Sequence, residues 1–156
     1  MSWKDLEWEI KDKDGKVTTV KTADLMSRTV LYKVGHHGSH NATLREHGLE
    51  LMTHPELVAM IPVDRDMAKS KKTSTNLKGW QMPEQNLFNR LKEKTRGRII
   101  IADECDHSEL TDRCNKDDAF INRVKFSGES FAPSTKPSTK NPPAREPLYV
   151  EYEVKN

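Results

Sequence analysis

The sequence lacks any apolar run near the roughly 20 residues that a membrane-spanning helix needs. Its first residues also lack the apolar core of a secretory signal peptide. Both absences predict a cytoplasmic protein with no membrane association. Charge of one sign is not in excess either, because 26 basic residues face 24 acidic ones. This balance gives no case for a dedicated nucleic-acid binder, although local basic patches leave nucleic-acid binding open.

Cysteines and apolar residues are also scarce. The two cysteines, Cys105 and Cys114, lie too far apart for the usual zinc-site pair, which is spaced by about two to four residues. Two thiols in a polar loop are the simplest interpretation, and a small metal site or a disulfide are the alternatives. Hydrophobic residues make up 34% of the chain and charged residues 32%, which leaves little apolar surface to bury. The composition therefore predicts a fragment, or a piece that packs against a partner.

The centre of the chain alternates between strand-like and helix-like patterns. Short apolar runs of strand length are separated by stretches with apolar residues at helical spacing. The expected elements are strand 30–34, helix 44–52, strand 58–63, helix 83–96 and strand 99–102. Such alternation is typical of a layered α/β sheet. We take residues 30–102 as the core of a single partial domain that spans residues 1–156.

Weaker patterns flank this core. An Asp14-Gly15 turn between two short extended runs predicts a hairpin, and a short helix is expected over 23–28. The polar residues 64–76 predict a loop. Residues 103–147 are expected to be irregular, since their second half is rich in proline and serine. Alternating apolar and polar residues over 148–154 predict a final strand.

The first expected core strand leads into a turn rich in histidine. Its sequence is Gly35-His36-His37-Gly38-Ser39-His40-Asn41. Turns after buried strands of α/β sheets often carry ligand groups. Neutral imidazole binds Zn²⁺ well and titrates near neutrality, so the cluster suits either metal binding or proton transfer. An ordinary polar turn with surface histidines is the alternative.

The longer string Val30-Leu-Tyr-Lys-Val-Gly-His-His-Gly-Ser-His-Asn-Ala-Thr resembles a segment of the metallo-β-lactamase superfamily. It is most similar to the hydrolase domains of DNA-uptake competence proteins and their stand-alone relatives. In that group a strand leads into His-His-Gly-Ser, and a helix, a strand, a polar loop, a second helix and a further strand follow. Residues 30–102 follow the same order.

The resemblance implies the C-terminal half of a metallo-β-lactamase-type αββα sandwich. It also implies one or two divalent metals, zinc being expected, that activate water to hydrolyse a small-molecule ester or amide or a phosphodiester. By the same resemblance His36 is the expected metal ligand and His37 the catalytic partner of a substrate oxyanion. Ser39 and His40 are expected to support them by hydrogen bonding.

Two departures from the family pattern bear on activity. The main metal motif of the family, His-x-His-x-Asp-His, is absent from the sequence, as is the Gly-Asp pair that precedes the double histidine. Where many relatives have Gly-His-Pro, this chain has Gly79-Trp80-Gln81-Met82-Pro83. We therefore expect an incomplete hydrolase, inactive alone, whose partner is the missing N-terminal half of the fold. The alternatives are a non-catalytic binding or regulatory module and a truncated frame that folds poorly.

Three further groups carry possible chemistry. Lys69, Lys71 and Lys72 form a cationic cluster suited to phosphate, although a solvated loop explains them equally well. Trp80 is a candidate for stacking on a substrate ring or, more simply, a packing anchor. The run 103–107 contains several potential metal ligands, and an ordinary charged loop is the alternative interpretation.

Overall fold

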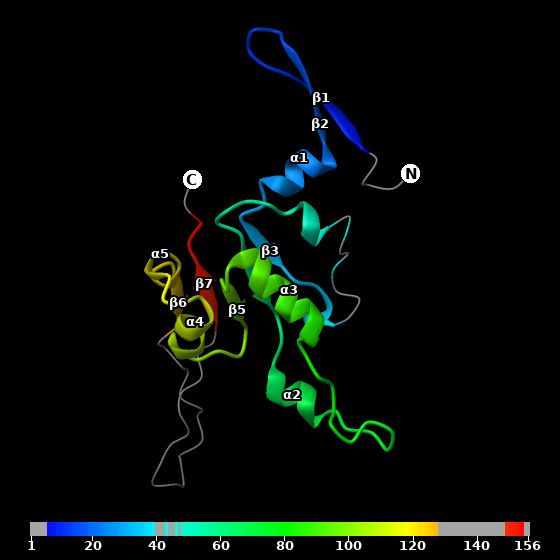
Figure 1. Ribbon diagram of the computed structural model, residues 1–156, viewed down its shortest axis with the longest axis vertical. Coiled ribbons are helices and arrows are strands. Elements are labelled where there is room, and N and C mark those ends of the chain that lie inside the picture. The colour runs from blue at the N-terminus through cyan, green and yellow to red at the C-terminus, as the bar shows by residue number, and fades with distance from the viewer. Residues whose placement is uncertain (1–5, 40–42, 44–45, 47, 128–148, 155–156) are drawn as a thin grey trace, which may run out of the picture.

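The computed structural model describes residues 6–39, 43, 46, 48–127 and 149–154 (Figure 1). This part of the chain is a mixed α/β structure with three small sheets. The strands are β1 (Glu7–Lys11), β2 (Val17–Lys21), β3 (Leu31–Lys33), β4 (Val58–Ile61), β5 (Ile99–Ile101), β6 (Val124–Phe126) and β7 (Val150–Tyr152). The α-helices are α1 (Thr22–Ser27), α2 (Arg65–Ser70), α3 (Gln85–Thr95), α4 (Ser108–Arg113) and α5 (Asp118–Ile121). None of the helices in the described ranges is long and apolar enough to span a bilayer.

The central sheet consists of β3, β4 and β5, which run parallel in chain order. Ala59 and Ile61 of β4 pack in one core cluster with residues of α3. Val58 packs in a second cluster with residues of α4, α5 and β6. Because β4 and β5 are covered on both faces, their sequences are apolar throughout, as is usual for parallel strands. The three predicted core strands are confirmed.

Helix α3 confirms the second predicted core helix, with its first residue two positions after Pro83. The Glu84 side chain accepts a hydrogen bond of 2.8 Å from the backbone N–H of Leu87 and so caps the helix. Arg96, in the left-handed region, ends it before Gly97.

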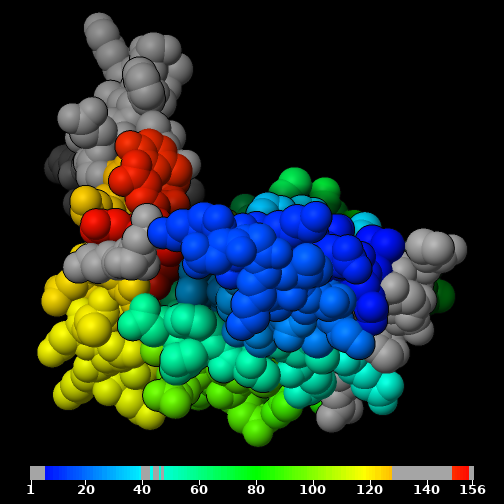
Figure 2. Space-filling view, turned by 90° about the horizontal axis from the view of Figure 1, so that it is seen from above, coloured from blue at the N-terminus to red at the C-terminus, as the bar shows by residue number. Residues whose placement is uncertain are grey.

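The N-terminal hairpin and helix α1 are also as predicted. Strands β1 and β2 pair antiparallel, with Trp8 opposite Val20. The carboxylate of Asp12 accepts hydrogen bonds from the backbone N–H groups of Asp14 and Lys16, both at 2.9 Å. The hairpin extends away from the central sheet in Figure 1, and Figure 2 shows it over a different part of the molecule from α4 and α5.

Three expectations about local structure need correction. The helix expected over 44–52 is not formed in its described part, where only a 3-10 turn over Leu49–Leu51 occurs. The reason is Gly48, whose φ of −142° and ψ of −93° are not helical. The loop expected over 64–76 contains α2, since the Asp64 side chain accepts a hydrogen bond of 2.7 Å from the N–H of Met67 and caps a helix there.

The third correction concerns residues 103–147, which were expected to be irregular. Helices α4 and α5 and strand β6 occupy much of 103–127, because Leu110, Phe120 and Val124 bury themselves against the sheet and stabilise short elements. Residues 128–148 lie outside the described part. The predicted final strand is present as β7, which pairs antiparallel with β6.

Gly97 is a position where only glycine fits. Its φ is +81°, and a Cβ there would lie 2.0 Å from the carbonyl oxygen of Arg113. Gly15 has nearly the same φ, +78°, with nothing within 4 Å of its Cβ position. We therefore expect Gly97→Ala to lower the free energy of unfolding by about 3 kcal/mol, because the strain of the left-handed backbone adds to the steric clash with Arg113.

The matched control Gly15→Ala carries the backbone strain alone and should cost about 1 kcal/mol. Urea denaturation of both variants followed by circular dichroism measures the difference. Equal losses in the two variants would show that the contact between Gly97 and Arg113 does not constrain the fold.

Candidate functional site

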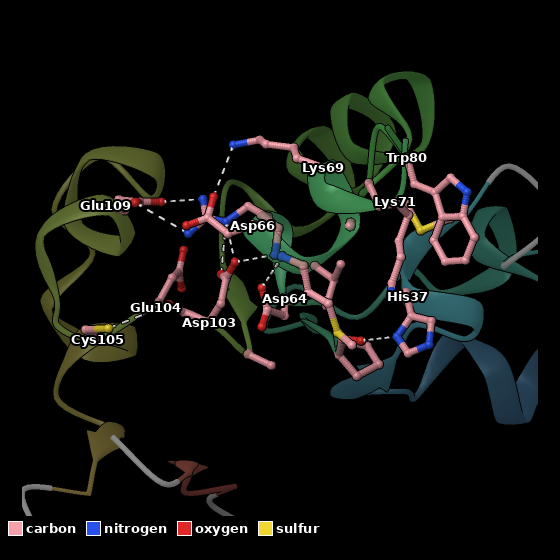
Figure 3. A pocket seen from close by; sticks show the side chains of 17 residues that line it. His37, Asp64, Asp66, Lys69, Lys71, Trp80, Asp103, Glu104, Cys105 and Glu109 are labelled. Atoms are coloured by element: carbon pink, nitrogen blue, oxygen red, sulfur yellow. Dashed lines mark hydrogen bonds and ion pairs between the residues drawn. The ribbon is translucent and has the colours of Figure 1, made fainter. Parts of the chain in front are cut away.

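The carboxyl ends of the three parallel strands meet at one edge of the central sheet. β3 leads to His36 and His37, β4 leads to Asp64, and β5 leads to Asp103. His37, Asp64 and Asp103 line a hollow of about 980 Å³ (Figure 3). Ligands of open parallel sheets bind at this edge, so the hollow is the candidate site.

The histidine turn has an unusual backbone. His36, His37 and Gly38 have φ values of 43°, 56° and 75°, three successive residues in the left-handed region. A Cβ on Gly38 would lie 2.8 Å from the Cβ of Pro83, so a larger residue does not fit. The backbone N–H of Glu84 donates a 2.7 Å hydrogen bond to the carbonyl of Gly38 and holds the turn against the start of α3.

The imidazole of His37 is oriented by a hydrogen bond. Its Nδ1 lies 2.6 Å from the carbonyl oxygen of Pro62, which directly follows β4. A carbonyl only accepts, so Nδ1 carries the proton and, in the neutral ring, Nε2 carries the lone pair. The ring therefore offers one basic nitrogen at the wall of the hollow.

The other predicted site residues lie differently. His36 is exposed and does not line the hollow. Ser39 is half-buried, and its backbone N–H donates a 3.0 Å hydrogen bond to the carbonyl of His36. His40 lies outside the described residues. Of the three predicted residues that the structure describes, His37 alone lies at the wall of the hollow.

Arg65 joins two of the strand ends. Its Nε lies 2.9 Å from the carboxylate of Asp103, and its backbone N–H donates to the same carboxylate at 2.7 Å. Its Nη1 donates to Glu109 of α4 at 2.7 Å. The hydrogen bond with Asp103, aided by Glu109, raises the pKa of Arg65 above its usual value. This clamp was not predicted, since no local sequence pattern pairs Arg65 with a carboxylate so distant in the chain.

The run 103–107 does not form a second metal site. Asp103 is bound by Arg65, and Glu104 is buried beside Arg113. Burial raises the pKa of Glu104, while the charge of Arg113 opposes this rise. His107 directs Nε2 to the carbonyl of Val124 at 2.9 Å. These side chains are engaged with different partners instead of converging on one point.

The cysteines only partly match the simplest interpretation, because Cys114 lies at the end of α4 in a core cluster and not in a polar loop. Neither Cys105, which is exposed, nor Cys114, which is buried, forms a disulfide. Cys105 contributes to the rim of the hollow near Glu104, and Cys114 packs in the second core cluster.

The end of the hollow opposite Asp103 is cationic and aromatic. Lys71 and Trp80 come from the segment that follows α2, whereas Lys69 of α2 directs its ammonium to Asp66, 3.6 Å away. The backbone N–H of Trp80 donates a 3.0 Å hydrogen bond to the carbonyl of Ala68, which returns the chain to α2. A Cβ on Gly79 would lie 2.0 Å from the carbonyl of Lys69, so glycine permits this close approach.

Zinc would require more ligands than this site supplies. The described ranges contain no group of three or more His, Cys, Asp and Glu side chains able to hold a metal ion. His37 fits the role of a single ligand, whereas Asp103 and Glu109 are taken up by Arg65. The described residues therefore do not form a complete metal centre.

Comparison with known proteins yields no further assignment, since no family model, no curated protein and no solved structure matches the chain.

The Arg65 clamp leads to a prediction about stability. Asp103→Ala removes charge-assisted hydrogen bonds at a group that is only 20% exposed, and it should lower the free energy of unfolding by roughly 2 kcal/mol. Asp66→Ala is the matched control, because that side chain is 98% exposed and lies 3.6 Å from Lys69. It should change stability by less than about 0.5 kcal/mol.

Urea denaturation of both variants is the measurement. A loss for Asp103→Ala no larger than that for Asp66→Ala would mean that the clamp does not hold the two strand ends together.

Proposed function

We propose that the chain is the C-terminal portion of a metal-dependent hydrolase of the metallo-β-lactamase superfamily. The first support is the resemblance of the string from Val30 to Thr43, together with the three parallel strands β3, β4 and β5 and helix α3. The observation that carries the proposal is the position of His37, whose tautomer is set by Pro62 at the carboxyl edge of a parallel sheet. The metal centre would be completed by a segment carrying His-x-His-x-Asp-His.

The hydrogen bond of His37 supports a role as metal ligand. Metal-binding histidines commonly donate their second N–H to a backbone carbonyl or carboxylate, which fixes the ring and raises its basicity. His37 makes this kind of contact with Pro62 at 2.6 Å. The resemblance alone suggested the reverse, with His36 as the ligand and His37 beside the substrate. We therefore propose His37 as the ligand and keep Ser39 and His40 as supporting residues.

The proposal also accounts for the small number of metal ligands that the described residues supply. A zinc ion takes about four ligands, and His37 provides one of them in the described ranges. The completed centre would supply Lewis-acid activation for hydrolysis. This chain would contribute one ligand and the wall of the hollow that faces the substrate.

Zinc titration by calorimetry tests the proposal. The chain alone should bind zinc weakly and should not hydrolyse a generic phosphodiester above background. Addition of a polypeptide that supplies the first half of the fold with His-x-His-x-Asp-His should produce tight zinc binding and turnover. In that mixture His37→Ala should weaken zinc binding by about tenfold or more, because a ligand is lost.

His54→Ala is the matched control in the same mixture. His54 precedes β4 and so lies at the opposite edge of the sheet, where its Nδ1 accepts a 3.1 Å hydrogen bond from the N–H of Glu56. Its loss should leave zinc binding unchanged. Indifference to zinc in every mixture would favour a non-catalytic binding module. Chelator-sensitive turnover by the chain alone would contradict the proposed division of the site.

A further inference from the structure

The hollow has two ends of different chemistry, as Figure 3 shows. At one end the carboxylates of Asp103 and Glu109 are engaged by Arg65, at 2.9 and 2.7 Å. At the other end lie Lys71, Trp80 and His37. No described acidic residue forms an ion pair with Lys71, so its positive charge remains available to a ligand.

Trp80 gives this end an apolar wall. Its side chain is large and 49% exposed, yet it faces a hollow, and its backbone is anchored to α2 through Ala68. Met82, which is half-buried, lines the same wall and packs against the core. An exposed indole held on a fixed backbone is a surface on which a planar ring can stack without much ordering of the protein.

We propose that this end of the hollow binds an organic anion that joins a negative group to a planar ring through a short linker, as a nucleoside phosphate does. The ring stacks on Trp80 and the anionic group pairs with Lys71. Asp64 and Asp66, which also line the hollow on the side of Asp103, repel the anion and keep it at the lysine end. His37 then lies beside the bound group.

The role of this ligand as a substrate rests on the proposed function. Binding itself requires only residues of this chain, so it can be measured without metal. This separation allows the two proposals to succeed or fail independently.

The experiment is equilibrium dialysis of the full chain against adenosine 5′-monophosphate, in the presence of a chelator and at low salt. Saturable binding is expected. Adenosine and inorganic phosphate should each bind at least about tenfold more weakly, because each keeps only one of the two contacts. Lys71→Gln should weaken binding of the nucleotide about tenfold, and raising the salt concentration should weaken it in the same direction.

Matched variants identify the two contacts. Lys72→Gln removes the neighbouring positive charge, which does not line the hollow, and should leave affinity unchanged. Trp80→Leu should weaken binding about tenfold, Trp80→Phe should retain most of it, and Trp8→Leu on the hairpin should have no effect. Thermal unfolding of each variant, followed by circular dichroism, confirms that the fold is kept.

Absence of saturable binding by the folded wild-type chain would overturn the ligand class, as would equal affinity in wild type and Lys71→Gln. Undiminished binding by a folded Trp80→Leu variant would also overturn it. Nucleotide binding that depends on Lys71 and Trp80, in a chain whose mixtures never bind zinc, would uphold this site and refute the hydrolase proposal. Zinc-dependent turnover without nucleotide binding would do the reverse.

Discussion

The structure depends on the parallel pairing of β4 with both of its neighbours. Leu31 pairs with Val58 on one side, and Ala59 pairs with Ile99 on the other. This register places both core clusters on opposite faces of one strand and brings three strand ends to one edge. His37, Asp64 and Asp103 of the candidate site each follow a strand that ends at this edge, and Lys71 and Trp80 come from the segment after α2.

Two arginines of this charge-rich chain have largely buried side chains that are hydrogen-bonded to backbone carbonyls. Arg98 is 6% exposed and donates to the carbonyls of Pro55 and Leu57. Arg113 donates to the carbonyl of Ile99 at 2.6 Å and pairs with buried Glu104. Burial of a charge is costly unless it is hydrogen-bonded in this way. These arginines therefore join elements that a small apolar core alone would leave weakly connected.

The sequence predicted the parts of the fold whose signals are local. Apolar runs marked the three core strands, and the position of His37 after β3 followed from them. Helix α2 was missed because its cap, Asp64, stands among charged residues with no apolar periodicity. The contacts of His37 with Pro62 and of Arg65 with Asp103 were beyond prediction, since each joins residues far apart in the chain. Such contacts depend on strand order and register, which composition and spacing do not specify.

Glu84 serves two elements at once, because its side chain caps α3 and its backbone N–H binds the carbonyl of Gly38. The histidine turn is thus attached to a helix that is itself packed on the sheet. The histidine turn therefore loses its conformational entropy when the domain folds and not when a ligand binds. A ligand of His37 therefore meets a preorganised ring, and a larger share of its interaction energy is available as affinity.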